Sequence, residues 1–340
     1  MLPTVARPLC FTLAIAALSA ALGVAGCGGT SASSSSSSTS SAATTTNTTA
    51  TLPGTGKPPI TIGDKNFTEQ FLLGELYSEA LTAQGYSVSL NQNIGPTEVT
   101  TQALQSGRLD MYPEYLDVGW QPARAPWSPP VGGYTQPYGS ERSAYRAAQR
   151  YALTLGLELL DATPFSDTNA IAVTSSFSAQ NGVTTIADLG PLAPTLTFGG
   201  PAEFQQSPDG LPAIERAYGL QPAVYKALSV GGQYQALDHQ LVQAADVNTT
   251  DGQLANGSYT LLTDPHHVFG WGNVAPVVPL TVLEREGPAF AATINRVSAL
   301  LTTTVMRRLN AAVDISGQDP KVVAEQFLTS YGLRPAPPGS

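Results

Sequence analysis

Residues 60–77 read ITIGDKNFTEQFLLGELY, and residues 107–115 read GRLDMYPEY. The first stretch predicts a short apolar strand at 60–63 and a helix with Thr68 as its N-cap, flanked by Phe67 and Leu72 as a hydrophobic staple. A second strand at 88–94, a helix from Thr97 through Leu104 and a third strand at 109–112 are expected to follow. Two β-α-β units in succession predict a parallel sheet with right-handed crossovers.

The same alternation continues through the rest of the chain. Strands are predicted at 156–160, 170–173, 195–198, 244–247, 259–262 and 273–278, and helices at 140–155, 186–189, 211–218, 233–241, 288–301, 302–313 and 320–331. The chain is expected to cross to a second lobe near Pro164 and to return at 273–278. We therefore predict an α/β fold with a ligand cleft between two lobes, residues 59–165 with 273–338 and residues 166–272, and hinge closure around the ligand.

The start of the chain predicts export. In residues 1–26, Arg7 is the only charge, and an apolar run at 9–24 ends in small residues before Cys27, as in a signal peptide. Val24-Ala25-Gly26-Cys27 resembles the bacterial lipobox, which implies a lipid on Cys27. The alternative is a transmembrane anchor, for which the run is short of the roughly 20 residues required. The remainder of residues 27–58 is a Ser/Thr-rich tether with too little apolar surface to fold.

Composition excludes several classes of protein. The two cysteines, Cys10 and Cys27, both fall in the signal and lipid segment, so the folded part has no disulfide, cysteine nucleophile or cysteine metal site. The net charge of −9 disfavours a nucleic-acid partner. His266 and His267 are adjacent, but no His-x-x-x-His motif, glycine-rich phosphate loop or nucleophile elbow is present. We therefore expect no cofactor and no enzyme activity, although carboxylates lie near the predicted strand ends.

Ligands of open α/β sheets bind beyond the carboxyl ends of the strands. Lys65 and Asn66 follow the first strand there, and the N-terminus of the next helix suits a carboxylate. Of the residues after the third strand, either Tyr112 or Tyr115 is expected to point into the cleft. The alternatives are that Lys65 is an exposed surface lysine and that both tyrosines pack in the core.

These two motifs closely resemble the substrate-binding proteins of osmoprotectant ABC transporters, which take glycine betaine, carnitine or choline. The resemblance continues at 197–204, 209–212, 234–238, 249–252, 273–278 and 300–303. It implies a two-lobed periplasmic-binding-protein fold of type II. It also implies a monomer, held at the extracytoplasmic face of the membrane through Cys27, that delivers a small-molecule solute to the permease subunits of an ABC transporter. A ligand-sensing or scaffold lipoprotein without a permease is the other possibility.

The resemblance also implies a ligand site, carried over to Lys65, Gln70 and Tyr115. The other family positions hold different residues: Val118 for a threonine, Asn169, Asn248 and Gly272 for tyrosines, and Ser207 for an arginine. Losing three ring faces would forfeit several kcal/mol of cation binding, at roughly 0.5–2 kcal/mol each. The amides favour a more polar or hydroxylated ligand, and Trp120, Trp127 or Trp271 could supply a replacement ring. The predicted set is Lys65, Asn66, Gln70, Tyr115, Asp167, Asn169, Asn248 and Trp271.

Overall fold

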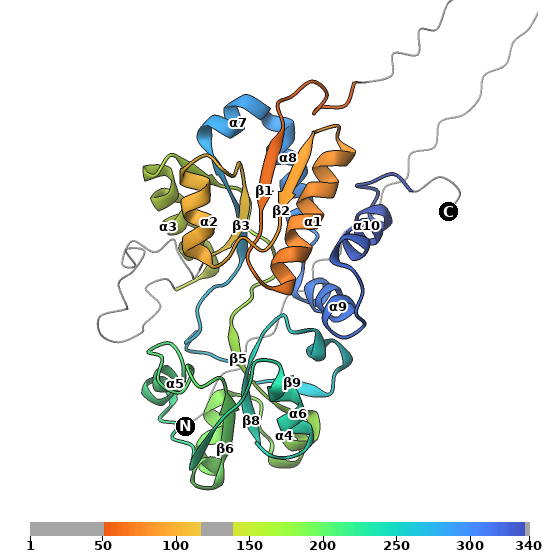
Figure 1. Cartoon of the computed structure of the whole chain (residues 1–340). Helices are drawn as coiled ribbons and strands as arrows, with labels where there is room; N and C mark the ends of the chain where they lie inside the picture. The colour runs from red at the N-terminus through yellow and green to blue at the C-terminus, as the bar shows by residue number, and fades with distance from the viewer. Residues whose placement is uncertain (1–50, 117–138, 337–340) are drawn as a thin grey trace, which may run out of the picture. The chain divides into compact units, whose positions relative to one another are not determined.

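The computed structural model of the protein describes residues 51–116 and 139–336, and these form two α/β lobes (Figure 1). The predicted export signal, Cys27, the tether up to residue 50, Val118, Trp120 and Trp127 lie outside the described residues. None of the helices in the described ranges is long and apolar enough to cross a membrane. The lobe boundaries proposed above lie where Ser166 and Asn273 pair in an antiparallel bridge.

The sheet of the first lobe combines strands from both ends of the chain. β1 (Ile60–Gly63) pairs in parallel with β2 (Val88–Asn91), and a parallel bridge from Ile62 to Met111 joins β1 to the start of β3 (Tyr112–Tyr115). β10 (Val274–Pro279) lies antiparallel between β3 and β4 (Leu157–Leu159). The parallel arrangement predicted for the first three strands is confirmed, and β10 makes the complete sheet mixed.

Helix α1 (Thr68–Ala83) follows β1 and forms the centre of the first-lobe core. Its Leu72 and Leu76 are fully buried together with Phe290. Burial of each such side chain contributes about 1.5–3 kcal/mol. The other helices of this lobe are α2 (Thr97–Gln105), α3 (Glu141–Thr154), α7 (Leu280–Glu286), α8 (Pro288–Ser298), α9 (Thr303–Asp314) and α10 (Pro320–Ser330).

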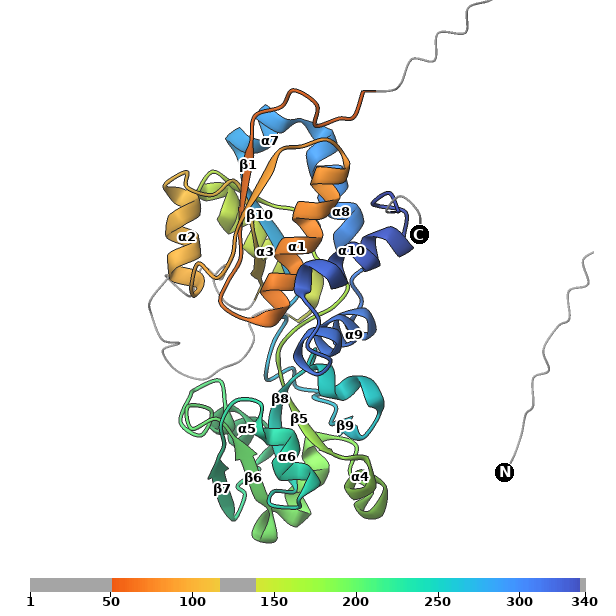
Figure 2. The ribbon, with the colours of Figure 1, turned by 45° about the vertical axis from the view of Figure 1, so that its right-hand side comes forward.

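The second lobe has one five-stranded sheet. Its strand order is β7 (Val224–Ala227), β6 (Thr197–Gly200), β8 (Ala244–Asn248), β5 (Asn169–Thr174) and β9 (Tyr259–Leu261), with β5 antiparallel to both neighbours. Figure 2 shows β7 beside β6 at one edge. The short helices are α4 (Ser175–Asn181), η1 (Ile186–Thr195), α5 (Leu211–Tyr218), α6 (Gly232–Asp238) and η2 (Gly252–Asn256). Separate apolar clusters form around Phe198 and around Val247.

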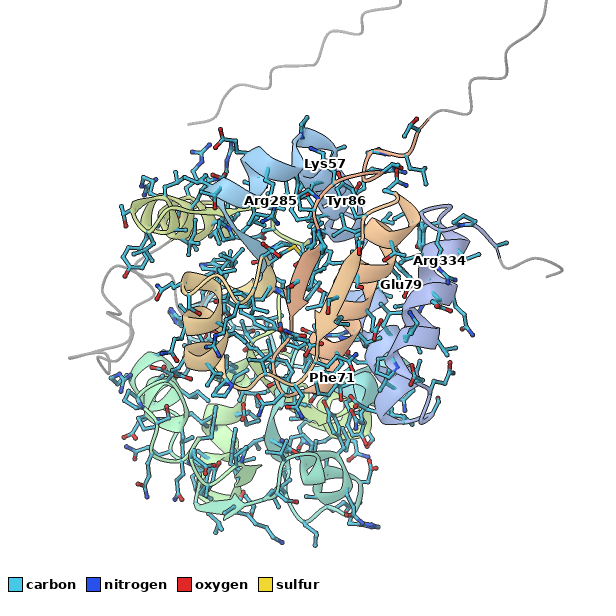
Figure 3. All side chains as sticks on the ribbon, turned by 45° about the horizontal axis from the view of Figure 1, so that its top comes forward. Lys57, Phe71, Glu79, Tyr86, Arg285 and Arg334 are labelled. Carbon is cyan, nitrogen blue, oxygen red and sulfur yellow. The ribbon has the colours of Figure 1, made fainter. Side chains whose placement is uncertain are left out.

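Ion pairs attach the C-terminal helix to α1. Arg334 Nε lies 3.2 Å from Glu79 Oε2 (Figure 3). Lys321 also contacts Glu79. On another part of the lobe, Lys57 Nζ donates a hydrogen bond of 2.9 Å to the carbonyl oxygen of Arg285. Lys321 and Arg334 remain partly exposed, so solvent screens these ion pairs, and we attribute the docking of α10 mainly to its buried Val323 and Leu328.

Helix α9 contacts both lobes. Its Met306 is buried in the first-lobe core, while Arg307 Nε donates to the carbonyl oxygen of Thr249, 2.8 Å away, after β8. A Cβ at Gly252 would lie 2.7 Å from Ala311 Cα, so the close approach of η2 to α9 requires glycine. This helix therefore positions the residues after β8 against the first lobe.

Several predicted boundaries were wrong. The N-cap positions of α1 and α2 are occupied by Phe67 and Pro96, neither of which makes a side-chain cap. The Thr68 hydroxyl instead donates to Asp314 Oδ1 at 2.7 Å, a tertiary contact that local pattern does not reveal. The third strand begins at Tyr112, three residues later than predicted. The segments β7, α4 and α7 were not predicted because they are short and only partly buried.

The turn after β1 contains a buried carboxylate that should make stability depend on pH. Burial, opposed by a hydrogen bond from the Asn93 N–H and reinforced by Glu75, raises the pKa of Asp64 from 3.8 to about 7. Since the folded state holds this proton more tightly than the unfolded chain, the stabilisation is complete below about pH 4 and is lost as the pH rises through 7.

We therefore expect Asp64→Asn to become progressively more stable relative to wild type between pH 4 and 7. Urea unfolding at several pH values measures this difference, with the exposed Asp161→Asn as control. A difference that stays constant over this range would contradict the assignment.

Candidate functional site

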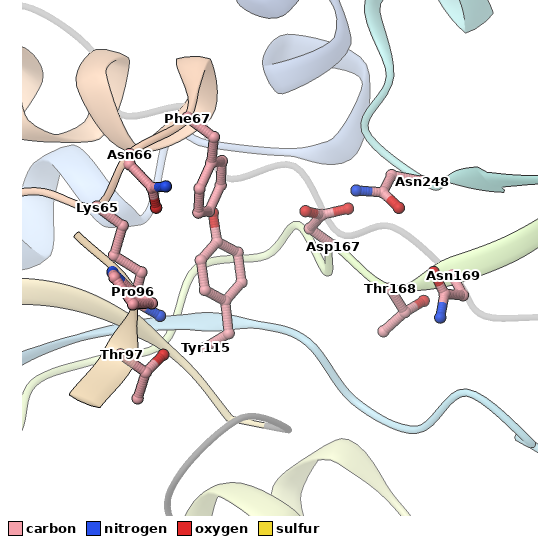
Figure 4. Close-up of a pocket in the computed structure, with 10 residues that line it drawn as sticks. All are labelled: Lys65, Asn66, Phe67, Pro96, Thr97, Tyr115, Asp167, Thr168, Asn169 and Asn248. Carbon is pink, nitrogen blue, oxygen red and sulfur yellow. The ribbon is translucent and has the colours of Figure 1, made fainter. Parts of the chain in front are cut away.

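A cavity of about 460 Å³ lies at the strand ends of both lobes. The first lobe contributes the turn after β1, the start of α2 and the last residue of β3, and the second lobe contributes the residues that lead into β5 and end β8. The lining residues are Lys65, Asn66, Phe67, Pro96, Thr97, Tyr115, Asp167, Thr168, Asn169 and Asn248 (Figure 4). The site thus lies where the strand-end argument expects a ligand.

Lys65 is buried and ion-paired. Its ammonium group contacts the carboxylate of Glu114, and both side chains are almost fully withdrawn from water. Glu114 also accepts hydrogen bonds from the Tyr112 hydroxyl and from the Tyr115 N–H, at 3.1 and 2.8 Å. A ligand carboxylate beside Lys65 would therefore compete with Glu114.

Two aromatic rings lie next to each other in the cavity. The centroids of Phe67 and Tyr115 are 6.0 Å apart with planes inclined by 32°, and Lys65 Nζ lies 5.2 Å from the Tyr115 ring centroid. The Phe67 side chain is 40% exposed. Sequence reasoning assigned Phe67 to a helix staple and missed it as a cavity residue. The signal that could have found it is its place in the turn between the end of β1 and the start of α1.

The second lobe presents amides to this cavity. Asn169 and Asn248 are direct partners in the antiparallel pairing of β5 with β8, so their side chains start from adjacent positions. Figure 4 shows these two residues and Asp167 across from the two rings. Such groups can donate and accept hydrogen bonds with a polar ligand.

Two of the predicted residues do not line the cavity. Gln70 is fully buried beneath it, where its Oε1 accepts from the Lys65 N–H at 3.3 Å. Trp271 packs on His267, with ring centroids 4.6 Å apart. A Cβ at the neighbouring Gly272 would lie 1.8 Å from the carbonyl oxygen of Asp167, so this backbone leaves no room for a ring there.

Beneath the rings, Glu69 is the centre of a buried hydrogen-bond network. Its Oε1 accepts from the Tyr115 hydroxyl and its Oε2 from Asn310 Nδ2, both at 2.9 Å. Asn310 Nδ2 also donates to the carbonyl oxygen of Thr250, at 2.9 Å. Burial raises the pKa of Glu69, and the hydrogen bonds from Asn310 and Tyr115 partly offset that rise. The network connects α1, β3 and α9 with the segment after β8.

The cavity presents aromatic, amide and charged side chains that can bind a solute. Within the described ranges, no three His, Cys, Asp or Glu residues are grouped so that they could hold a metal ion. Two α/β lobes that share a polar cavity with aromatic rings define a solute-binding protein of the periplasmic-binding-protein class.

The chain belongs to the family described as the substrate binding domain of ABC-type glycine betaine transport systems, whose model matches residues 58–330. It is therefore a protein that captures a solute on the extracytoplasmic side for delivery to an ABC permease, and this family consists of solute-binding proteins rather than enzymes.

Individual relatives are consistent with membership of this family. The chain is 31% identical to the glycine betaine-binding protein YehZ of Escherichia coli over 83% of this chain and 93% of the relative. It is 30% identical to the glycine-betaine-binding protein of Pseudomonas aeruginosa, over 81% and 88% of the two chains. The crystal structure of a glycine betaine/carnitine/choline ABC transporter protein has the same fold, with a TM-score of 0.72 at 22% identity over 81% of this chain and 99% of that chain.

The Glu69 network generates a stability prediction. Asn310→Leu keeps the side-chain size but removes the amide donor to Glu69 Oε2 and to the Thr250 carbonyl, so we expect a loss of about 1–3 kcal/mol in the free energy of unfolding. Urea unfolding at neutral pH measures it. Arg308→Gln, at an exposed position of the same helix, should change stability by less than about 0.5 kcal/mol. Equal effects of the two variants would show that the network contributes nothing.

Proposed function

We propose that the solute is a small compatible solute of the quaternary-ammonium type that is more polar than glycine betaine itself. The observation that carries this proposal is the composition of the cavity, in which Phe67 and Tyr115 face the amides of Asn169 and Asn248. Ring faces attract a cation at roughly 0.5–2 kcal/mol each. The amides add hydrogen bonds for a hydroxyl or carbonyl group, which the bare trimethylammonium lacks.

The neutralised lysine supports the same ligand class. Because Lys65 is already paired with Glu114, it holds a ligand carboxylate less firmly than a free buried lysine would. A ligand that relies on its carboxylate, as glycine betaine does, gains less here than one with additional polar groups. Lys65, Asn66, Tyr115, Asp167, Asn169 and Asn248 make up the proposed ligand-binding set, with Phe67 added by the structure. Gln70 supports it from below.

Calorimetric titration tests the ligand preference. We expect carnitine, which carries a hydroxyl group, to bind more tightly than glycine betaine. Low-micromolar or tighter binding of glycine betaine would contradict the proposal. Recovery of the bound ligand unchanged is also expected, because we propose that the protein has no enzymatic activity.

A matched pair of variants tests the ring. Phe67→Leu removes one aromatic face and should lower the affinity for carnitine by roughly 2- to 30-fold, the equivalent of about 0.5–2 kcal/mol. Phe71→Leu makes the same change four residues later on α1, at a position that does not line the cavity. It should leave the affinity unchanged. An equal loss in both variants would assign the effect to the helix and not to the ring.

We also propose that the protein acts as a monomer tethered to the membrane by a lipid on Cys27. The small-residue sequence before Cys27 supports this proposal. One acyl chain holds a protein only reversibly, whereas two give stable anchoring.

Cys27→Ser is therefore expected to move the protein from the membrane fraction to the soluble extracytoplasmic fraction. Cys10→Ser, within the predicted signal, should leave it in the membrane fraction. Retention of the Cys27→Ser protein in the membrane would favour the transmembrane-anchor alternative.

A further inference from the structure

A second cavity of about 550 Å³ adjoins the first and is lined by acidic and amide side chains. The two cavities share Phe67, Asp167, Asn169 and Asn248. The second extends between the start of α1, the start of α6, the end of β8, the segment that includes η2 and helix α9. Its further polar lining residues are Thr68, Glu69, Gln233, Tyr234, Asp246, Thr250, Asp251, Gln253, Asn310 and Asp314.

Three lining residues have a side-chain oxygen with no hydrogen-bond partner in the described part of the chain. They are Gln233 Oε1, Asp246 Oδ1 and Asn310 Oδ1, and each of these residues is more than nine-tenths buried. The Asn310 amide cannot simply be reversed, because its Nδ2 donates to both Glu69 and the Thr250 carbonyl. The amide oxygens of Gln233 and Asn310 are acceptors, and both oxygens of Asp246 accept when its carboxyl group is ionised, so a cation that brings N–H donors is the complement they lack.

Electrostatic interactions among the carboxylates favour a cation in the same place. Burial raises the pKa of both Asp246 and Glu69, and the nearby Asp251 raises each of them further. Burial raises the pKa of Asp251, and the charge of Asp314 raises it further. The charge of Arg307 lowers the pKa of Asp251. The Nε of Arg307 is already engaged, since it donates a hydrogen bond to the Thr249 carbonyl. Carboxylates that repel one another are stabilised when a positive charge binds between them.

We propose that this cavity is a second subsite, which binds a protonated amino or guanidino group of a small solute. The inference rests on the proposed solute-capture function of the first cavity and extends the class of ligand. A quaternary ammonium has no N–H and cannot satisfy the three oxygens, whereas a primary ammonium or a guanidinium can donate to several of them. The first cavity thus suits the methylated cation and the second the cation with N–H groups.

Calorimetric titration of the purified full-length protein at fixed ionic strength tests this subsite, with agmatine as the N–H-bearing probe and choline as the N–H-free probe. Asp246→Asn should lower the affinity for agmatine by at least about 10-fold, the effect of removing one hydrogen bond to a charged group. Gln233→Glu adds a carboxylate to the same cavity and should raise the affinity. Glu284→Gln removes a charge at an exposed position of α7, away from both cavities, and should change nothing.

The opposite shifts of Asp246→Asn and Gln233→Glu separate binding from misfolding, because a misfolded protein does not bind more tightly. Absence of agmatine binding, or equal effects of Asp246→Asn and Glu284→Gln, would overturn the second subsite. If choline or carnitine still binds in that case, the proposed function is retained and only the second subsite is rejected. If agmatine binds with the expected shifts and no quaternary ammonium does, the second subsite stands and the ligand proposed for the first cavity is rejected.

Discussion

The buried carboxylate of Glu69 is the constraint on which the arrangement of the site depends. A carboxylate withdrawn from water must be hydrogen-bonded or it loses its solvation without compensation. Glu69 accepts from Tyr115 and Asn310, and Asn310 also binds the carbonyl of Thr250. One buried group on α1 thus contacts a cavity ring and α9, and through Asn310 of α9 it is connected to the segment that follows β8.

Much of the fold could be predicted because local chemistry determines it. Apolar strands followed by helices at 3.6-residue spacing identified β1, α1 and α5, and the resemblance extended over both lobes. The capping prediction failed because Thr68 has a better partner, Asp314, on a helix far away in the sequence. The antiparallel direction of β10 is set by its two neighbours, β3 and β4. A strand's own residues do not encode its direction.

The site was predictable from two sources, the position of residues after a strand end and the resemblance, which supplied the positions in the second lobe. Lys65, Asn66, Tyr115, Asp167, Asn169 and Asn248 line the first cavity, as the strand-end rule and the resemblance suggested. Trp271 does not, because its ring packs on His267. The second cavity could not have been predicted, since its lining residues come from α1, α6, β8, η2 and α9 and share no motif. Only their convergence in three dimensions makes them a group.

The crossing between the lobes has an evolutionary consequence. At Gly272 the backbones of the two connecting segments come so close that a Cβ would overlap the Asp167 carbonyl oxygen, and the Asp167 N–H donates to the Gly272 carbonyl at 3.0 Å. Substitution of Gly272 alone cannot install an aromatic residue here, because the connecting segments would first have to separate. A single substitution at Gly272 therefore cannot place a ring at this position, and a new ligand preference is more accessible through the side chains that line the cavity.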